Sequence, residues 1–372
     1  MIQLPWTSKT SPHFVLEVNR QCNISCRGCY KAQGEGTRSL DDLAKEIDVA
    51  LTHAKIHTVT LAGGEPTLHP KLCEIVRLLH DRRLKTAIST NGVALSTELL
   101  GDLSDAGLDV VMLHLDEGQT RPDLSTEPSV EEIHALRRRL AERIASFGID
   151  VGLSVTIYPE YSDRVKEFVE FVLRTKHVNL LYATHHLERD GPDTSVAFRF
   201  QTDNDRRTTN AQIAQTLRES LGLEPFAFLP RQGEDSYDCR SLSYLSYYVP
   251  VVQETNRFQV LRMKSSWMDS LLIRLVGLLS GRFPFYVQPR TGMIRTHVLL
   301  NGLGSRRLAT ALRFLTATVR RGATVGAKRL VFDNGPVRTA DGRVICTEPC
   351  PNRTLADGKL VPVCMSDMEN RV

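Results

Sequence analysis

Six of the eight cysteines of this chain fall into two short groups, and thiols gathered in this way can bind metal. The first group is Cys22, Cys26 and Cys29, with the spacing CxxxCxxC. Three thiolates on one short loop can hold three corners of an iron–sulfur cube, and the fourth iron then stays open to a substrate. A structural zinc site is the alternative, but it usually takes four ligands, and no further Cys or His occurs within twenty residues after Cys29.

The second group lies in the last 27 residues and consists of Cys346, Cys350 and Cys364. We predict a second metal site there, either an iron–sulfur cluster or a small zinc site. Cys239 is a candidate for its fourth ligand, although a position left open for substrate is equally compatible with the sequence. The remaining cysteine, Cys73, lies in a helical pattern and is expected to be a buried hydrophobic residue.

Alternating strand and helix patterns, from His13 to about Glu188, predict the elements that position the first group. Each predicted strand is a compact apolar run, and these runs are His13–Val18, Thr58–Ala62, Lys85–Ser89, Val110–Leu115, Val151–Ile157 and Val178–Ala183. Helices are expected between them, near Leu40–Ala54, Pro70–Arg82, Ser96–Ala106, Val130–Phe147 and Ser162–Thr175. Such alternation builds a parallel sheet, either a partial barrel or an open doubly wound sheet, which binds ligands at the C-terminal ends of its strands.

Polar and glycine-rich residues follow several of these strands. The first strand leads into the CxxxCxxC loop, and the second leads into Gly63-Gly64-Glu65-Pro66, where paired glycines let the backbone approach a ligand closely. Ser89, Asn91 and Asp116 stand at the ends of the third and fourth strands. They are candidates for ligand contacts, although Asn-Gly and Asp also form ordinary turns.

The CxxxCxxC loop after the first strand, with GGEP after the second, resembles the radical S-adenosylmethionine (SAM) superfamily. The resemblance implies a partial (β/α)6 barrel of the TIM type in which Cys22, Cys26 and Cys29 hold a 4Fe–4S cluster. It also implies that SAM binds the open iron and is cleaved reductively to a 5′-deoxyadenosyl radical, which takes hydrogen from an unactivated carbon. A reductant such as flavodoxin or ferredoxin would supply the electron, and the enzyme would be an oxidoreductase or a transferase.

The same resemblance implies roles for single residues. Gly63, Gly64 and Glu65 are expected to bind the methionyl end of SAM, and Tyr30 to lie beside its adenine. Further contacts to SAM or substrate are expected from Ser89, Asn91 and Asp116. The family usually has an aromatic residue before the third cysteine, where this chain has Gly28. The C-terminal trio looks like a short version of an extension that carries an auxiliary iron–sulfur cluster.

A strongly basic segment, residues 256–330, holds fourteen Lys or Arg and a single acidic residue, Asp269. Ser266–Leu279 reads as an amphipathic helix, and a second apolar stripe follows between Leu308 and Val319. One interpretation is a membrane-surface enzyme that acts on a lipid or isoprenoid. A site for RNA, a peptide or a phosphorylated small molecule is the second interpretation, and an ordinary core helix with a solvated basic face is the third. A non-enzymatic iron–sulfur or zinc scaffold is a further alternative.

These observations predict three regions: a radical SAM core (13–200), a connecting region (201–265) and a basic, α-rich C-terminal region with the second cysteine group (266–372). Met1–Pro12 contains no apolar run long enough for a secretory signal. The longest apolar stretch, Leu271–Leu279, is interrupted by Arg274 and is too short to cross a bilayer. We therefore expect a cytoplasmic protein, bound peripherally to the inner membrane face if its substrate is a lipid.

Overall fold

Six parallel strands form the centre of the fold in a computed structural model that describes residues 1–27, 29, 34–186, 188–189, 198–199, 209–231, 242–254, 257–286, 288–320, 323–338 and 344–366. In spatial order these strands are β2 (His13–Asn19), β4 (Thr58–Gly63), β5 (Lys85–Thr90), β6 (Val110–His114), β8 (Asp150–Ile157) and β9 (Val178–His185). Each predicted apolar run coincides with one of these strands. The register is parallel throughout, because every connection is a crossover through a helix.

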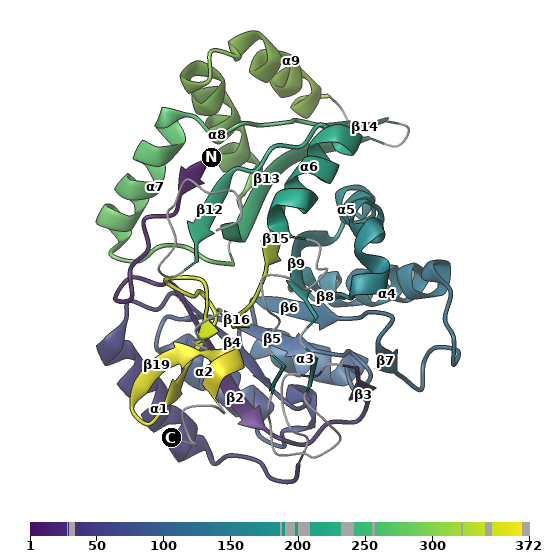
Figure 1. Cartoon of the computed structure of the whole chain (residues 1–372), viewed down its shortest axis with the longest axis vertical. Helices are drawn as coiled ribbons and strands as arrows, with labels where there is room; N and C mark the ends of the chain where they lie inside the picture. The colour runs from purple at the N-terminus through teal and green to yellow at the C-terminus, as the bar shows by residue number, and fades with distance from the viewer. Residues whose placement is uncertain are drawn as a thin grey trace.

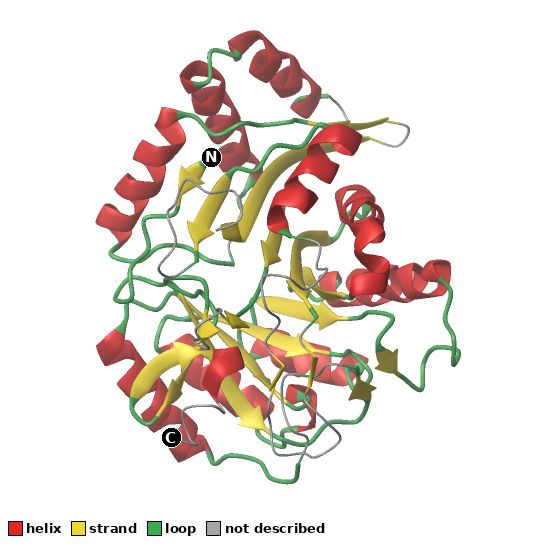
Figure 2. Ribbon diagram, viewed as in Figure 1, coloured by secondary structure: helices red, strands yellow, loops and turns green. Residues whose placement is uncertain are grey.

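One helix follows each parallel strand and packs on the outer face of the sheet (Figures 1 and 2). The helices are α1 (Leu40–His53), α2 (Leu72–Asp81), α3 (Thr97–Asp105), α4 (Val130–Ala145), α5 (Val165–Arg174) and α6 (Asn210–Leu221). Side chains alternate along the strands, so Val111 and Leu113 of β6 face these helices while Val110 and Met112 face the opposite side. The six βα units confirm the predicted α/β fold of the partial-barrel type.

The parallel sheet continues at both edges with strands from later parts of the chain. Beyond β9 lie β15 (Thr324–Asp333), which is parallel to it, and the long antiparallel β13 (Leu242–Glu254). The short strands β12 (Ala227–Pro230), β14 (Arg257–Val260) and β1 (Ile2–Gln3) complete that side. Beside β2 lies the hairpin of β18 (Arg353–Ala356) and β19 (Lys359–Pro362). The core, connecting and C-terminal regions thus share one sheet, and their proposed boundaries stay a prediction.

Three helices of the basic segment, α7 (Trp267–Ser280), α8 (Thr291–Gly304) and α9 (Leu308–Thr318), stand at one end of the molecule (Figure 1). Asp269, in the first turn of α7, forms a capping box with Ser266 at the N-cap. It is the one buried residue of that helix. The apolar residues of α7 therefore do not form an ordinary core face. Within the described residues, none of the helices has the length and hydrophobicity needed to cross a bilayer.

Candidate functional site

A cavity of about 290 Å³ opens at the C-terminal ends of the parallel strands and brings both cysteine groups together. The CxxxCxxC loop contributes one wall with Cys22, Cys26 and Cys29. The second wall carries Cys346, Cys350 and Cys364, which lie more than 300 residues later in the chain. Gly63, Gly64, Glu65, Ser89 and Asn91 line the cavity between them, so it gathers most of the site residues that the sequence predicted.

The CxxxCxxC loop is held by the turn that follows β6. Ser25 and Cys26 form the short strand β3 (Ser25–Cys26), which pairs with β7 (Gln119–Thr120). The Arg27 amide donates to the Gly118 carbonyl at 2.7 Å, and the Tyr158 hydroxyl donates to the Arg27 carbonyl at 3.1 Å. Hydrogen bonds of this length hold the backbone of the loop and so fix the direction in which the cysteine side chains point.

The two glycines of GGEP allow the end of β4 to lie in close contact with the same loop. The Gly64 amide donates to the Asn19 carbonyl (2.9 Å), and the Glu65 amide donates to the Gln21 carbonyl (2.7 Å). A Cβ atom at Gly63 would stand 2.2 Å from the Asn19 carbonyl oxygen, and one at Gly64 would stand 2.1 Å from that of Gln21. The amides of Gly64 and Glu65 are therefore engaged with the loop, and the missing side chains are required by the close approach of two backbones.

The Glu65 carboxylate is buried and bonded within the protein. One of its oxygens accepts from the Thr67 amide (3.0 Å), from the Thr67 hydroxyl (2.5 Å) and from the Thr90 hydroxyl (2.6 Å). The other oxygen accepts from the Asn91 amide at 2.8 Å. With four donors, this carboxylate ties the turn after β4 to the end of β5. Contact between Glu65 and the methionyl group of SAM stays a prediction.

Ser89 and Asn91 line the cavity, and their contacts with SAM or substrate stay a prediction. The Asn91 side chain also reaches the cysteine loop, since its amide donates to the Asn23 side-chain oxygen at 2.7 Å. That contact joins the end of β5 to the residue after Cys22.

Asp116 is buried beside the cavity and is not among its lining residues. Its carboxylate accepts from the Thr156 amide, the Gly118 amide and the His114 ring. Although burial alone raises the pKa of Asp116, these partners lower it to about 2, with the His114 charge the largest of them. Asp116 is thus an anion that supports the turn behind Cys26, and its predicted contact with SAM or substrate stays a prediction.

Two thiols of the first trio, Cys22 and Cys26, lie in a partly buried setting that favours their protonated form. Burial raises the pKa of the Cys22 thiol, and burial together with Cys29 raises that of Cys26 to about 12. Thiolate ligands must lose their protons, so iron binding would release protons here. The donor set fits an iron–sulfur cluster, because three thiols from one loop face one cavity and the loop is anchored on both sides.

The thiols of the second trio interact with one another through Cys346. The Cys350 and Cys364 thiols bond to Cys346 and lower its pKa, while the same bonds raise the pKa of Cys350 and Cys364. The Ser11 hydroxyl donates to the Cys350 carbonyl at 3.3 Å, and Cys364 lies in the turn after β19. Among the described residues, no three Cys, His, Asp or Glu side chains are arranged as the ligand set of one metal ion.

Three residues of the sequence interpretation, Gly28, Tyr30 and Cys239, lie outside the described residues. Their predicted roles beside the third cysteine, beside adenine and as a fourth ligand of the second site therefore stay predictions.

Sequence reasoning missed a chain of hydrogen-bonded polar side chains in the wall of this cavity. The Tyr182 hydroxyl donates to Asp333 at 2.6 Å, and the Asn352 side chain donates to Tyr182. All three side chains line the cavity. No local pattern marks them, because β9, β15 and the segment before β18 meet only in the folded chain.

An α/β sheet whose strand ends hold a thiol-lined cavity defines a cofactor-binding protein of the barrel class. Residues 16–172, which include the cysteine loop, GGEP, Asn91 and Asp116, match the family model of the Radical SAM superfamily. This part of the chain is therefore a radical SAM domain, and members of the superfamily use a 4Fe–4S cluster and SAM and generally need a reductant.

Curated relatives match part of the chain. One is the tungsten-containing aldehyde ferredoxin oxidoreductase cofactor-modifying protein of Pyrococcus furiosus, 28% identical over 171 residues, which are 43% of this chain and 48% of the relative. Another is the probable GTP 3′,8-cyclase of Pyrococcus abyssi, 32% identical over 104 residues, which are 27% of this chain and 33% of the relative. The chain thus spans less than half the length of either relative.

Solved structures resemble the chain more weakly. SuiB of Streptococcus suis bound to its precursor peptide SuiA gives a TM-score of 0.43 at 16% identity, covering 58% of this chain and 46% of SuiB. Native anSMEcpe with bound AdoMet gives a TM-score of 0.40 at 14% identity, covering 57% of this chain and 60% of that structure.

Proposed function

We propose that this chain is a radical SAM enzyme that cleaves SAM reductively and abstracts hydrogen from an unactivated carbon of a substrate bound in the thiol-lined cavity. The observation that carries the proposal is the shared cavity, which brings Cys22, Cys26 and Cys29 together with the glycine turn and the end of β5. When bound, a reduced 4Fe–4S cluster supplies the electron for the cleavage of SAM to methionine and a 5′-deoxyadenosyl radical.

The chain's own residues then have defined tasks. Cys22, Cys26 and Cys29 hold the cluster, while Gly63 and Gly64 form the wall for the methionyl end of SAM. Ser89 and Asn91 stand at the cavity surface with polar side chains, and Tyr30 is proposed beside the adenine.

Release of 5′-deoxyadenosine tests this function. The anaerobically reconstituted, dithionite-reduced protein should convert SAM to methionine and 5′-deoxyadenosine, even without the natural substrate. If protein loaded with iron and sulfide releases neither product, the chain is a metal-binding scaffold and the proposal is wrong.

We further propose that Cys346, Cys350 and Cys364 hold an auxiliary iron–sulfur cluster at the opposite wall of the cavity. The proposal is supported by the three thiols of the second trio lining the same cavity as the first trio. Three protein thiols leave one iron of a cube open, either to Cys239 or to the substrate. A zinc site is the other candidate for these residues.

Cys346→Ala should lower the iron and acid-labile sulfide content of the reconstituted protein by about one cluster of the two, because it removes the thiol that bonds to both partners. Metal analysis before and after the substitution measures the change. An unchanged iron and sulfide count would exclude the auxiliary cluster, and zinc lost in place of iron would favour the zinc site.

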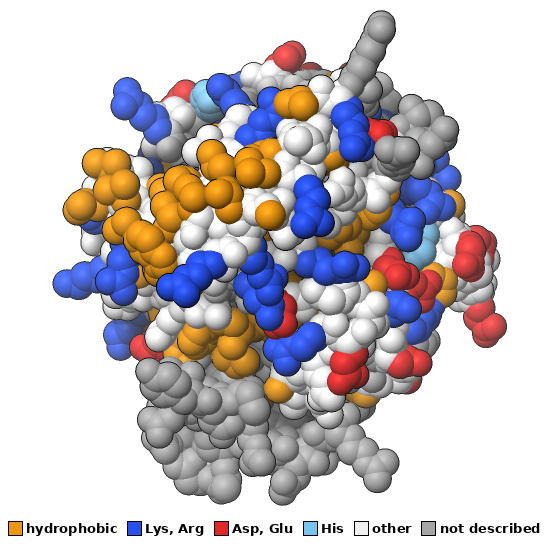
Figure 3. Space-filling view, turned by 90° about the horizontal axis from the view of Figure 1, so that it is seen from above, with side chains coloured by type: hydrophobic (Ala, Val, Ile, Leu, Met, Phe, Trp, Pro, Cys, Tyr) orange, Lys and Arg blue, Asp and Glu red, His pale blue; other side chains and the backbone are white. Residues whose placement is uncertain are grey.

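For the substrate class we propose a lipid or isoprenoid reached from a membrane surface. Helices α7 to α9 expose large apolar side chains, and Figure 3 shows such patches bordered by Lys and Arg on this side of the molecule. We define the apolar face by its exposed members, Trp267, Leu271, Leu275, Val276, Leu278, Leu279, Met293, Leu299, Leu303, Leu308, Leu312 and Val319. Apolar side chains ringed by basic ones match an anionic bilayer, on which each basic residue contributes about 1 kcal/mol.

Flotation with vesicles tests the apolar face. We expect binding to vesicles of phosphatidylglycerol and phosphatidylcholine, weak binding to phosphatidylcholine alone, and loss of binding as salt rises. The double substitution Leu278→Ser/Leu279→Ser should weaken binding at least tenfold, because both side chains are over three-quarters exposed (80% and 77%) and would enter the bilayer. Val49→Ser, at an exposed apolar residue of α1, serves as the matched control.

Two outcomes of vesicle flotation combined with an RNA gel-shift assay would contradict the membrane proposal. If the protein does not bind anionic vesicles but slows the migration of RNA in a gel at moderate salt, a nucleic acid becomes the proposed substrate class. If it binds neither, a peptide or a phosphorylated small molecule becomes the substrate class to pursue. A position at the inner face of the membrane is part of the lipid proposal and is rejected with it.

A further inference from the structure

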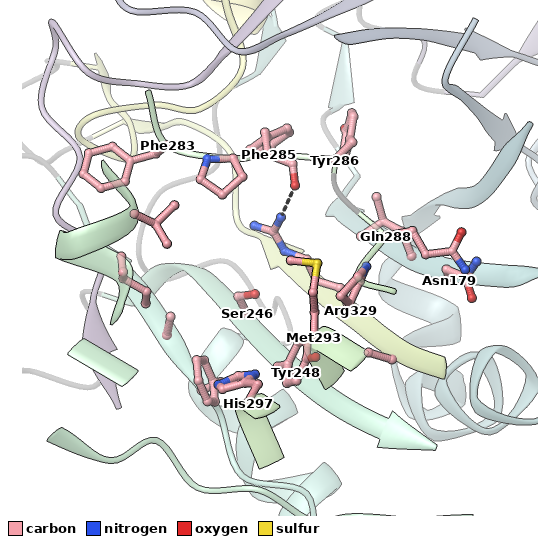
Figure 4. A pocket seen from close by; sticks show the side chains of 18 of the residues that line it. Asn179, Ser246, Tyr248, Phe283, Phe285, Tyr286, Gln288, Met293, His297 and Arg329 are labelled. Atoms are coloured by element: carbon pink, nitrogen blue, oxygen red, sulfur yellow. Dashed lines mark hydrogen bonds between the residues drawn. The ribbon is translucent and has the colours of Figure 1, made fainter. Parts of the chain in front are cut away.

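A second cavity of about 710 Å³ lies at the opposite, N-terminal ends of the central strands. Val110 of β6, Val151 of β8 and Leu180 of β9 form its floor, and helices α7 and α8 with the segment between them cover it. In Figure 4, Phe283, Phe285 and Tyr286 face Tyr248 and His297 across the space. We call it the apolar cavity, and its volume lies within the range of about 300–1,000 Å³ that is typical of ligand sites.

The apolar cavity and the thiol-lined cavity lie on the same face of the sheet and share one side chain, Tyr286. The segment that carries Tyr286 is held by Arg329 of β15. The Arg329 guanidinium donates to the Phe285 carbonyl at 2.9 Å and to the Tyr244 hydroxyl at 3.1 Å. Phe285 also stacks on His13, a residue of the thiol-lined cavity, with ring centroids 4.4 Å apart. Tyr286 and Phe285 thus form the wall between the two cavities.

The outer end of the apolar cavity is continuous with the apolar face. Val276 and Met293 belong to both, with 41% and 57% of their surface exposed. An apolar path therefore runs from the side of the molecule proposed to contact a membrane to the wall at Tyr286.

Polar groups in the lining are few and engaged with one another. Asp269 accepts from His297 at 2.7 Å and from Asn301 at 2.7 Å, which joins α7 to α8. Gln288 lies beside Asn179 at one end of the cavity (Figure 4), and the Asp150 carboxylate is its other polar neighbour. Arg329 is bonded to the Phe285 carbonyl and the Tyr244 hydroxyl, and most of the remaining lining is aliphatic or aromatic, which suits a hydrocarbon.

We propose that the apolar cavity binds the hydrocarbon tail of an amphiphilic substrate, so that the tail enters past Val276 and Met293 and its end reaches the thiol-lined cavity beside Tyr286, the side chain that both cavities share. This inference deepens the proposed function and rests on it for the chemistry. The binding itself can be tested without any turnover.

Trp6 offers a direct readout, because it lies in the cavity wall and is one of two tryptophans in the chain. Trp267→Phe removes the other, which is exposed on α7. Titration of this variant with a long-chain conjugated polyene fatty acid, below its micelle concentration, should quench Trp6 emission by energy transfer with one saturable site. In a series of saturated fatty acid competitors, affinity should rise about threefold to fourfold per methylene and then level off once the cavity is filled.

A larger side chain at Ser246 would occupy part of the cavity, because the small, buried Ser246 side chain belongs to the lining. Ser246→Phe should weaken fatty acid binding at least tenfold, whereas Ser246→Ala should leave it unchanged. Leu278→Ser should leave it unchanged too, since Leu278 belongs to the apolar face but not to the cavity lining. A circular dichroism spectrum and an iron content equal to those of the parent protein show that the variant is folded.

Three results would overturn the inference: no saturable quenching of Trp6, quenching that Ser246→Phe does not reduce, or an affinity independent of chain length. The chain-length series needs no cavity substitution, so it decides the matter even if Ser246→Phe fails to fold. Formation of 5′-deoxyadenosine without Trp6 quenching rejects the tail site alone. Quenching without 5′-deoxyadenosine rejects the proposed radical chemistry alone.

Discussion

Cys26→Ala is expected to reduce the release of 5′-deoxyadenosine at least a hundredfold and to remove the iron of the first site. Cys26 is the central member of the trio, and β3 holds it in the loop by pairing with β7. Two thiolates do not hold a cube with one open iron, so neither the electron nor the site for SAM would remain. Product release is measured by chromatography and iron by colorimetric assay.

The matched control for this prediction is Cys73→Ala. Cys73 is a partly buried thiol of α2 that packs against the hydrophobic core, and it does not line the thiol-lined cavity. The substitution should leave iron content and product release at the parent values. Full activity in Cys26→Ala, or an equal loss in both variants, would contradict the assignment of the first trio.

Gly64→Ala is expected to lower the free energy of unfolding by about 3 kcal/mol and to impair iron loading, because the new methyl group would overlap the cysteine loop. The added Cβ would stand 2.1 Å from the Gln21 carbonyl oxygen and 2.7 Å from the Arg20 carbonyl carbon. Both contacts are to backbone, so a side-chain rotation does not relieve them, and the loop has to move. Urea denaturation of the apoprotein and the iron content after reconstitution measure the two effects.

Gly148→Ala separates this clash from backbone strain. Gly148 has a φ of +76°, but no atom lies within 4 Å of the place that an added methyl group would take, so alanine there costs only the strain, about 1 kcal/mol. It should load iron normally. If Gly64→Ala is no more destabilising than Gly148→Ala and also loads iron, the glycine turn does not position the cysteine loop.

The central strands were predictable because their apolar runs are short and clearly bounded. Val110–Leu115 and Val151–Ile157 were expected, and β6 and β8 occupy Val110–His114 and Asp150–Ile157. The C-terminal elements were harder. Strand β13 contains Pro250, which argues against an internal strand, but Pro250 lies between the stretches that pair with β12 and with β14.

Helix α8 escaped prediction because it has almost no apolar stripe. Its buried positions include Asn301 and Gly302 beside Ile294 and Val298. Asn301 is buried because it donates to Asp269 of α7, a partner 32 residues away in the sequence. A periodic pattern of apolar residues is the signal of a helix, and a polar interface between two helices does not produce it.

The site residues divide along similar lines. Both cysteine trios could be identified because the type and spacing of thiols carry the chemistry within a few residues. The structural tasks of Glu65 and Asp116 could not, because their partners Thr90, Asn91 and Thr156 come from other strands. Tyr286 likewise gains its place between two cavities only when the α7–α8 segment folds back against the sheet.

Electron paramagnetic resonance of the reduced protein tests the central claim most directly, since it observes the first cluster and its open iron at once. Anaerobic Cys346→Ala protein, which isolates the first site, should give a reduced-cluster signal that changes on addition of SAM. Cys26→Ala protein should lack that signal. Colourless, iron-free protein, or a cluster signal that SAM does not alter, would contradict the account.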